Sequence, residues 1–140
     1  MKSNVQGGKL RYHRVVMVII VIVSIWITYK STSGEWKYDN GQERVIGNRS
    51  ENMNEGLWTW YYPNGNKRME GNFIHGKRDG IWQTWNEKGN LLTTSNYVDD
   101  KLNGAYITWY ANGIKEQESF YKDDNPSGAV KKYNEDGSLK

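Results

Sequence analysis

The chain has 140 residues, no cysteine and two histidines, and its formal net charge is +3. Without cysteine it has no disulfide and no thiolate nucleophile, and two histidines leave almost no room for a metal cluster or a catalytic triad. Residues 1–29 carry four basic side chains and no acid, whereas the rest of the chain carries 15 basic and 16 acidic side chains. A near-neutral body lacks the basic face that phosphate backbones require, so the composition argues against a nucleic-acid binder and against an enzyme.

Residues 15–29 form an uncharged and almost wholly apolar run. As a helix it would span roughly 22 Å, short of the ~30 Å hydrocarbon core, although flanking lysine and arginine side chains can snorkel. The sequence therefore predicts a short transmembrane signal anchor. The residues taken to mark this span are Val15, Ile20, Trp26 and Tyr29. The basic segment 1–14 would stay in the cytoplasm, which places the repeats described below outside it, in the periplasm or at the cell surface.

Two alternatives exist for this apolar run. A cleaved signal peptide has a similar length, but no small-residue cleavage site follows residue 24. A buried helix or strand of a soluble domain is disfavoured because basic residues flank the run on both sides. The sequence favours the uncleaved anchor over both.

Two glycine positions recur every 24 residues through the rest of the chain. They are Gly41, Gly65, Gly89, Gly113 and Gly137, and then Gly56, Gly80, Gly104 and Gly128. Chance does not hold two positions in register over four copies. Residues 56–140 are therefore predicted to form a repeat array, and residues 30–55 a linker with a degenerate first unit.

Each repeat has the pattern of a β-hairpin. The pair Asn64-Gly65 and its equivalents supply the positive φ of a tight turn, and apolar and polar residues alternate before it. Gly56 and its equivalents are placed at the opening of the first strand. Three aromatic positions recur: Trp58, Trp82, Tyr106 and Val130; Tyr61, Trp85, Trp109 and Tyr133; and Phe73, Tyr97 and Tyr121. The first two positions are three residues apart, which puts them on opposite faces of a strand.

The predicted fold class is mainly β, an elongated meander sheet of 24-residue hairpins with one N-terminal transmembrane helix. In residues 30–140, 16 aromatic residues outnumber 13 isoleucine, leucine and valine residues. This ratio favours a thin sheet held by aromatic ladders over a globule with an aliphatic core.

The order G-x-W-x-x-W/Y-Y/N-x-x-G, followed by an aromatic residue and a charged loop, resembles the variant of the MORN repeat. It is most similar to the bacterial YwqK-type antitoxins, closely over residues 56–137 and loosely over 36–55. The resemblance implies a non-catalytic hairpin array that binds another macromolecule, either as an antitoxin or immunity partner of a toxin or as a membrane-associated scaffold.

The second unit departs from this pattern in its turn. Asn86 stands where Tyr62 and Tyr110 stand in other units, and Lys88 replaces the usual asparagine. Asn134 makes the same exchange as Asn86. The second turn is therefore expected to be looser, with the fold unchanged.

The aromatic side chains are the candidate binding surface, because tryptophan and tyrosine favour protein interfaces, sugars and cations. The alternative is that these side chains only stack the repeats on one another and bind nothing. The candidate surface consists of Trp36, Trp60, Tyr61, Tyr62, Trp85, Trp109 and Tyr110. The repeating glycines and the remaining aromatic positions are predicted to be structural.

The sequence predicts no metal site and no cofactor. Three charged segments recur and are predicted to be loops: Lys77-Arg78-Asp79, Asp99-Asp100-Lys101 and Lys122-Asp123-Asp124. The aspartate pairs of the last two lack the spaced ligands of a calcium loop. They are expected to be solvated turns, and His75 a surface residue. No nucleophile, paired-carboxylate site or phosphate-binding loop emerges.

The sequence therefore predicts a membrane-anchored, non-catalytic module that binds a protein partner. In its most specific form it is an immunity or antitoxin protein that neutralises a toxin by direct binding. The alternatives are a structural adaptor in a membrane or envelope complex, or a cell-envelope glycan or choline binder, whose repeats are shorter.

Overall fold

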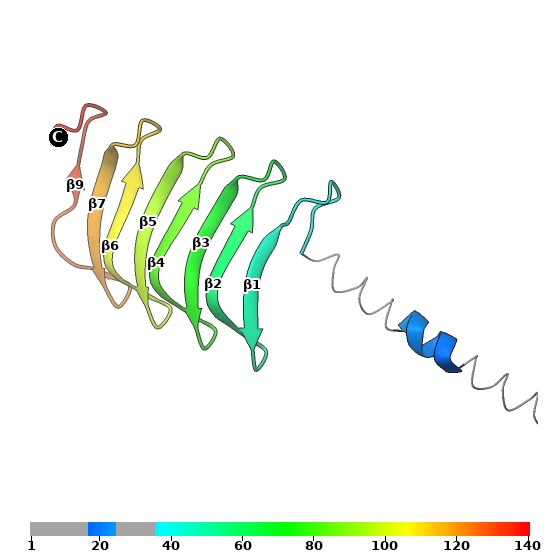
Figure 1. Ribbon diagram of the computed structural model, residues 1–140. Helices are drawn as coiled ribbons and strands as arrows, with labels where there is room; N and C mark the ends of the chain where they lie inside the picture. The colour runs from blue at the N-terminus through cyan, green and yellow to red at the C-terminus, as the bar shows by residue number, and fades with distance from the viewer. Residues whose placement is uncertain (1–16, 25–35) are drawn as a thin grey trace, which may run out of the picture. The chain divides into compact units, whose positions relative to one another are not determined.

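The computed structural model describes residues 17–24 and 36–140. The chain divides into two units, Met1–Trp36 and Lys37–Lys140. In the first unit, residues 17–24 form an α-helix with exposed side chains (Figure 1).

The prediction of a single-pass membrane protein is wrong. Eight residues of this helix, 17–24, are described. No helix in the described ranges is long and apolar enough to cross a membrane. Of the predicted span, Ile20 lies in the helix, while Val15, Trp26, Tyr29 and the tail 1–14 lie outside the described residues.

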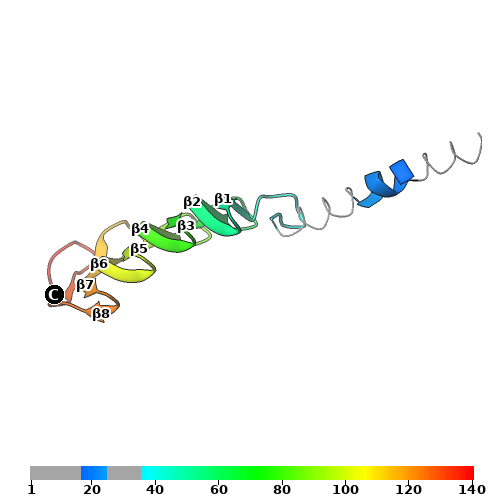
Figure 2. The ribbon, with the colours of Figure 1, turned by 90° about the horizontal axis from the view of Figure 1, so that it is seen from below.

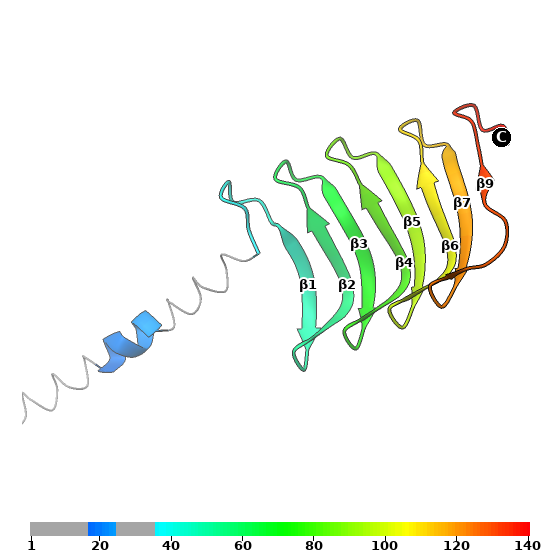
Figure 3. The ribbon, with the colours of Figure 1, turned by 180° about the vertical axis from the view of Figure 1, so that it is seen from behind.

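The second unit is one antiparallel sheet of nine strands (Figures 1 and 3). The strands are β1 (Val45–Ser50), β2 (Met53–Tyr61), β3 (Lys67–Ile74), β4 (Lys77–Trp85), β5 (Leu91–Val98), β6 (Lys101–Trp109), β7 (Lys115–Lys122), β8 (Asn125–Pro126) and β9 (Lys131–Lys132). They follow sequence order from β1 to β8, and β9 pairs with β7. The predicted meander of hairpins is confirmed, and Figure 2 shows that the sheet is a single layer.

The turns here called the Asn–Gly turns join β2 to β3, β4 to β5 and β6 to β7. They contain Asn64-Gly65, Lys88-Gly89 and Asn112-Gly113, so the second of them lacks the asparagine. Gly65 donates its N–H to Tyr62 O at 2.9 Å, and Tyr62 donates its N–H to Asn66 O at 2.8 Å. Gly65 has a φ of 87°, whereas Asn64 does not take a positive φ. The glycine alone therefore supplies the left-handed residue, at the end of a three-residue loop.

The charged segments predicted as loops are two-residue turns with strands on either side. Asp99 and Asp100 both have positive φ, 53° and 72°, which is the conformation of a tight hairpin turn. Lys77 and Arg78 belong to β4 rather than to a loop. The turns are shorter than expected because aspartate tolerates the left-handed region well enough to replace glycine.

Gly80 lies inside β4 and does not open it, which corrects the predicted place of this glycine position. Asn72 pairs with Asp79 and Glu70 pairs with Gln83, so three residues, 80–82, oppose the single residue Gly71. Gly80 has a φ of 78°. The glycine is required because the strand bulges here, and the bulge turns the side chain of Trp82 over the neighbouring strand.

Tryptophan rings over glycine form the core of the sheet. Trp58 and Trp82 are 3% and 5% exposed. A Cβ at Gly47 would overlap the Trp58 ring, and one at Gly71 would overlap the Trp82 ring. Each indole therefore lies directly on the backbone of the preceding strand, and each donates its Nε1–H to a backbone carbonyl there, Trp82 to Asn72 O at 3.2 Å.

Successive Asn–Gly turns are joined by side-chain hydrogen bonds. Tyr62 Oη donates to Trp85 O at 2.9 Å, and Asn64 Nδ2 donates to Glu87 O at 2.8 Å. Equivalent pairs start from Tyr38 and Asn40, and from Tyr110 and Asn112. These inter-turn hydrogen bonds fasten one edge of the array.

The turn of the second unit lacks the inter-turn hydrogen bonds. Asn86 Oδ1 accepts the N–H groups of Lys88 and Asn90 within its own turn, and no side-chain hydrogen bond joins this turn to the next in the described chain. No atom lies within 4 Å of the position of a Cβ at Gly113, whereas Gln42 Oε1 approaches that of Gly65 to 3.2 Å. The exchanges at Asn86 and Lys88 thus leave this junction loose.

We expect Gly71→Ala to destabilise the sheet by about 1–3 kcal/mol, because the added methyl displaces the Trp82 ring. Urea denaturation followed by tryptophan fluorescence measures the loss. Ser95→Ala is the matched control: it keeps the Cβ and removes only the 3.3 Å hydrogen bond from Ser95 Oγ to Trp82 O. An unchanged urea midpoint for Gly71→Ala would contradict the packing of Trp82 on Gly71.

Restoring the missing inter-turn contacts should stabilise the array. The double variant Asn86→Tyr/Lys88→Asn adds one hydroxyl and one amide donor, and we expect a gain of about 1 kcal/mol in urea denaturation. Tyr62→Phe, which removes such a donor at an intact junction, should lose a similar amount. If the double variant gains nothing while Tyr62→Phe loses stability, the junction is open for a reason other than these two residues.

Acid should destabilise the sheet through its ion-paired carboxylates. The hydrogen bond from Arg78 Nε to Asp100, 2.7 Å long, lowers the pKa of Asp100, and that from Lys115 Nζ, 2.9 Å long, lowers the pKa of Glu118. Because the folded pKa lies below the unfolded value, this stability is present above the ordinary carboxylate pKa and is lost as the pH falls through the folded pKa.

The measurement is the urea midpoint between pH 7 and pH 2.5. Asp100→Asn should lower the midpoint at pH 7 and flatten its dependence on pH. A variant whose pH profile runs parallel to that of the wild type would show that Asp100 does not contribute.

Candidate functional site

One side of the sheet, here called the aromatic face, carries most of the large rings. Its members are Trp58, Trp60, Phe73, Trp82, Tyr97, Tyr106 and Tyr121. They share a face because cross-strand partners in an antiparallel sheet point the same way: Gly56 pairs with Phe73, and Gly80 with Tyr97. Since the sheet has one layer, no second sheet covers these rings (Figure 2).

The rings of β2, β3 and β4 pack on one another. The Trp60 centroid lies 5.8 Å from that of Trp58 and 5.8 Å from that of Trp82. Phe73 meets Trp82 edge-on at 5.0 Å, and Tyr97 meets Trp82 edge-on at 6.3 Å. The two pairs of Trp60 are tilted by 32° and 36°, and the other two are edge-to-face. All four separations lie in the range of favourable aromatic pairs, so the rings hold one another in place.

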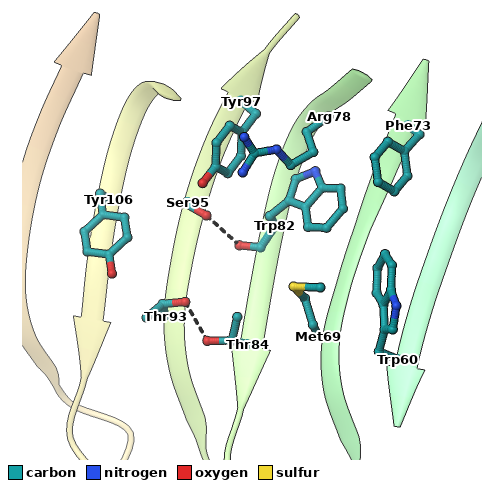
Figure 4. A pocket seen from close by; sticks show the side chains of 10 residues that line it. All are labelled: Trp60, Met69, Phe73, Arg78, Trp82, Thr84, Thr93, Ser95, Tyr97 and Tyr106. Atoms are coloured by element: carbon teal, nitrogen blue, oxygen red, sulfur yellow. Dashed lines mark hydrogen bonds between the residues drawn. The ribbon is translucent and has the colours of Figure 1, made fainter. Parts of the chain in front are cut away.

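A groove of about 560 Å³ opens on the aromatic face beside these rings (Figure 4). Its lining residues are Trp60, Met69, Phe73, Arg78, Trp82, Thr84, Thr93, Ser95, Tyr97 and Tyr106. One row of paired residues explains the hollow. Trp60 pairs with Met69, which pairs with Thr84, and Thr84 pairs with Thr93. The row thus changes from large to small side chains at β4 and β5.

The groove has apolar walls and a small polar centre. The hydroxyls of Thr84 and Thr93 lie 2.6 Å apart, and either one can be the donor. Ser95 Oγ donates to Trp82 O at 3.3 Å. In Figure 4 these polar side chains lie between Tyr106 on one side and Trp82 and Met69 on the other. A ligand would therefore meet rings around its edge and hydroxyls beneath it.

Arg78 supplies the charge of the groove. Its guanidinium carbon lies 4.0 Å from the centroid of the Tyr97 ring, and its Nη2 donates to Asp100 O at 3.0 Å. Burial is the largest single effect and lowers the pKa of Arg78, but the hydrogen bonds and charge interactions with Asp100 and Tyr97 together outweigh it and raise the pKa. The group is therefore charged at every physiological pH, and no carboxylate lines the groove.

Of the predicted surface residues, only Trp60 lines the groove. Tyr61, Trp85 and Trp109 belong to the opposite face, as their three-residue offset from the Trp58 position predicts. On that face Trp109 Nε1 donates to Thr94 Oγ1 at 3.1 Å. Lys67 Nζ lies 5.6 Å from the centroid of the Trp85 ring. All three side chains are half-buried.

Two other predicted residues lie at one edge of the sheet. Tyr62 and Tyr110 are in the Asn–Gly turns and form the inter-turn hydrogen bonds. Trp36 is the last residue of the first unit and is half-buried. The candidate surface predicted from the sequence is thus divided among two faces and an edge, and the structure does not bring it together.

The acidic turns and His75 make contacts within the sheet. Asp99 Oδ1 lies 2.6 Å from Lys77 Nζ, and His75 lies in a turn with its Nδ1 3.6 Å from Glu55. Asp124 Oδ1 accepts the N–H of Leu102 at 2.8 Å. No group of three or more metal-ligating side chains occurs in the residues that the structure describes.

The groove contains residues that the sequence analysis did not select, namely Met69, Arg78, Thr84, Thr93 and Ser95. One signal for them was present in the repeat itself. The position 24 residues after Trp60 is Thr84, and that after Gly71 is Ser95. Thr108 and Ser119 follow at the next copies, so the groove lies where the large side chain of the first unit gives way to small side chains.

The comparisons with known proteins agree with this architecture. The model of the MORN repeat variant matches residues 54–75, 78–99 and 102–123, one match for each of three consecutive hairpins. No curated protein matches the chain, and the narrower similarity to YwqK-type antitoxins is not confirmed. The chain therefore belongs to the MORN-repeat family, whose arrays are repeat modules that bind proteins or membranes.

Proposed function

We propose that this chain is a non-catalytic protein-binding module and that its partner docks on the aromatic face at the groove. The observation that carries the proposal is an open groove walled by Trp60, Trp82 and Tyr106 on a single-layer sheet. Large rings with a polar tip, held rigidly by their neighbours, are the side chains that contribute most to protein interfaces. They also lose little conformational entropy when a partner binds.

The ring geometry supports a protein partner over a choline or sugar ligand. A quaternary ammonium group needs the free faces of several rings, and sugars stack on such faces. Here Phe73 and Tyr97 meet Trp82 edge-on, and the face of Tyr97 is occupied by the Arg78 guanidinium. The remaining surface suits a side chain inserted between the rings.

The most specific form of this function is that of an immunity or antitoxin protein, which would neutralise a toxin by covering its active surface. Binding alone would be sufficient for such a role. A structural adaptor in a larger complex is the alternative, and it would use the same surface. The identity of the partner separates the two roles.

The experiment is affinity purification of the full-length chain from the source cells, with the recovered protein identified and its affinity then measured with purified components. We expect Tyr106→Ala to weaken binding about tenfold or more, as for a central interface residue. Trp85→Ala, on the opposite face, is the matched control and should bind as the wild type does.

Circular dichroism and urea denaturation of both variants establish that they fold. Equal losses in the two variants would place the partner away from the aromatic face. Recovery of a toxin supports the immunity role, and recovery of subunits of a larger assembly supports the adaptor role.

A further inference from the structure

The groove lies where one repeat has a ring and the next has none. Trp60 projects from β2 and its centroid lies 5.8 Å from Trp58, 6.3 Å from Phe73 and 5.8 Å from Trp82. It thereby joins the rings of three neighbouring strands. The residues at the same position of the next two repeats are threonines, Thr84 on β4 and Thr108 on β6. The Thr84 side chain cannot reach the rings that a tryptophan at this position would reach.

The rings that would surround such a tryptophan are all present. The repeat equivalents of Trp58, Phe73 and Trp82 are Trp82, Tyr97 and Tyr106, and all three line the groove (Figure 4). The space around Thr84 is therefore built as the surroundings of an aromatic ring.

The ring contacts of the aromatic face are also interrupted at the groove. Trp82 contacts Tyr97 and Tyr106 contacts Tyr121, both with centroids 6.3 Å apart. No ring contact joins Tyr97 to Tyr106 in the described sheet, whereas Phe73 and Trp82 bridge the equivalent strands at 5.0 Å. The ladder is interrupted between β5 and β6, at the groove.

We propose that the groove is a recognition site for an aromatic side chain, tryptophan above all, which a partner protein inserts beside Thr84, at the place that corresponds to the ring of Trp60 in the preceding repeat. This inference rests on the proposed function, because it names the group by which the partner is held. The inserted ring would contact Trp82, Tyr97 and Tyr106 and restore the ladder across β5 and β6.

The floor of the groove suits the polar edge of an indole. In the Thr84–Thr93 pair one hydroxyl donates to the other, and each oxygen keeps a free lone pair that can accept an indole N–H. Within the sheet itself, Trp82 Nε1 donates to a backbone oxygen in the same manner. A phenylalanine ring would fill the space without using these acceptors.

The groove offers little net charge to the residues that flank the inserted ring. Arg78 is the only charged residue in the lining, and its guanidinium is ion-paired with the Asp100 carboxylate, with Nε 2.7 Å from Oδ1. A charged neighbour of the inserted ring would lose solvation without gaining an unpaired partner here. The expected occupant is thus an aromatic residue within an uncharged segment.

The test uses the full-length chain and N-acetyl-L-tryptophanamide as the probe, followed by amide chemical shifts in NMR. We expect saturable shifts centred on Thr93, Ser95 and Tyr106 at millimolar probe, and none with N-acetyl-L-alaninamide. Thr84→Trp fills the groove from within and should abolish the shifts. Gln83→Trp adds the same side chain to the opposite face and should leave them unchanged.

Shifts that persist in Thr84→Trp, or that fall outside the groove, overturn the inference. If Thr84→Trp does not fold, Tyr106→Ala removes one wall and should weaken probe binding about fivefold or more; unchanged binding again overturns it. A partner that binds Thr84→Trp and Gln83→Trp equally well also overturns it and leaves protein binding intact. If the groove binds the probe but affinity purification recovers no protein partner, the proposed protein-binding function fails, whereas the groove remains a binding site for an aromatic ring.

Discussion

The structure depends on the packing of an indole ring on a bare peptide backbone. Trp82 lies on Gly71 and Trp58 on Gly47, and no side chain larger than hydrogen fits beneath either ring. A single-layer sheet has no second layer to bury its rings, so it buries them against its own neighbouring strand. The bulge at Gly80 turns the ring into this position, and the repeat period follows from repeating that arrangement every two strands.

A sheet of this kind can vary its surface without losing its fold. The strand ladders and the turns at both edges hold each hairpin to the next, so no single ring is needed to close the array. At β5, Ser95 replaces the glycine, and the ring that pairs with it on β6 is the smaller Tyr106. The serine hydroxyl then bonds to the backbone of Trp82, which offsets some of the lost ring contact.

Much of the fold could be predicted from the sequence, because the turn glycines, such as Gly65, and the alternation of apolar and polar residues before them are typical of β-hairpins. The faces of Trp58 and Trp85 also followed from their spacing. The bulge at Gly80 could not be predicted, because the sequence does not distinguish a glycine at a turn from a glycine at a bulge. The groove could not be predicted because it depends on Thr84 and Ser95. These small residues leave a hollow only beside their cross-strand neighbours, which the sequence does not identify.

The hairpin of β4 and β5 differs from the hairpin before it at four contact positions. Thr84 and Ser95 lie in the two strands, and Asn86 and Lys88 lie in the turn between them. Each exchange removes a contact that the preceding hairpin makes: a ring, a close ring-to-backbone contact, or the inter-turn hydrogen bonds. Thr108 and Ser119 repeat the first two exchanges one unit later, so the groove lies at the boundary between the unit with the ring of Trp60 and the units without it. The proposed binding site falls at this boundary because a partner can supply only those contacts that the array does not already make with itself.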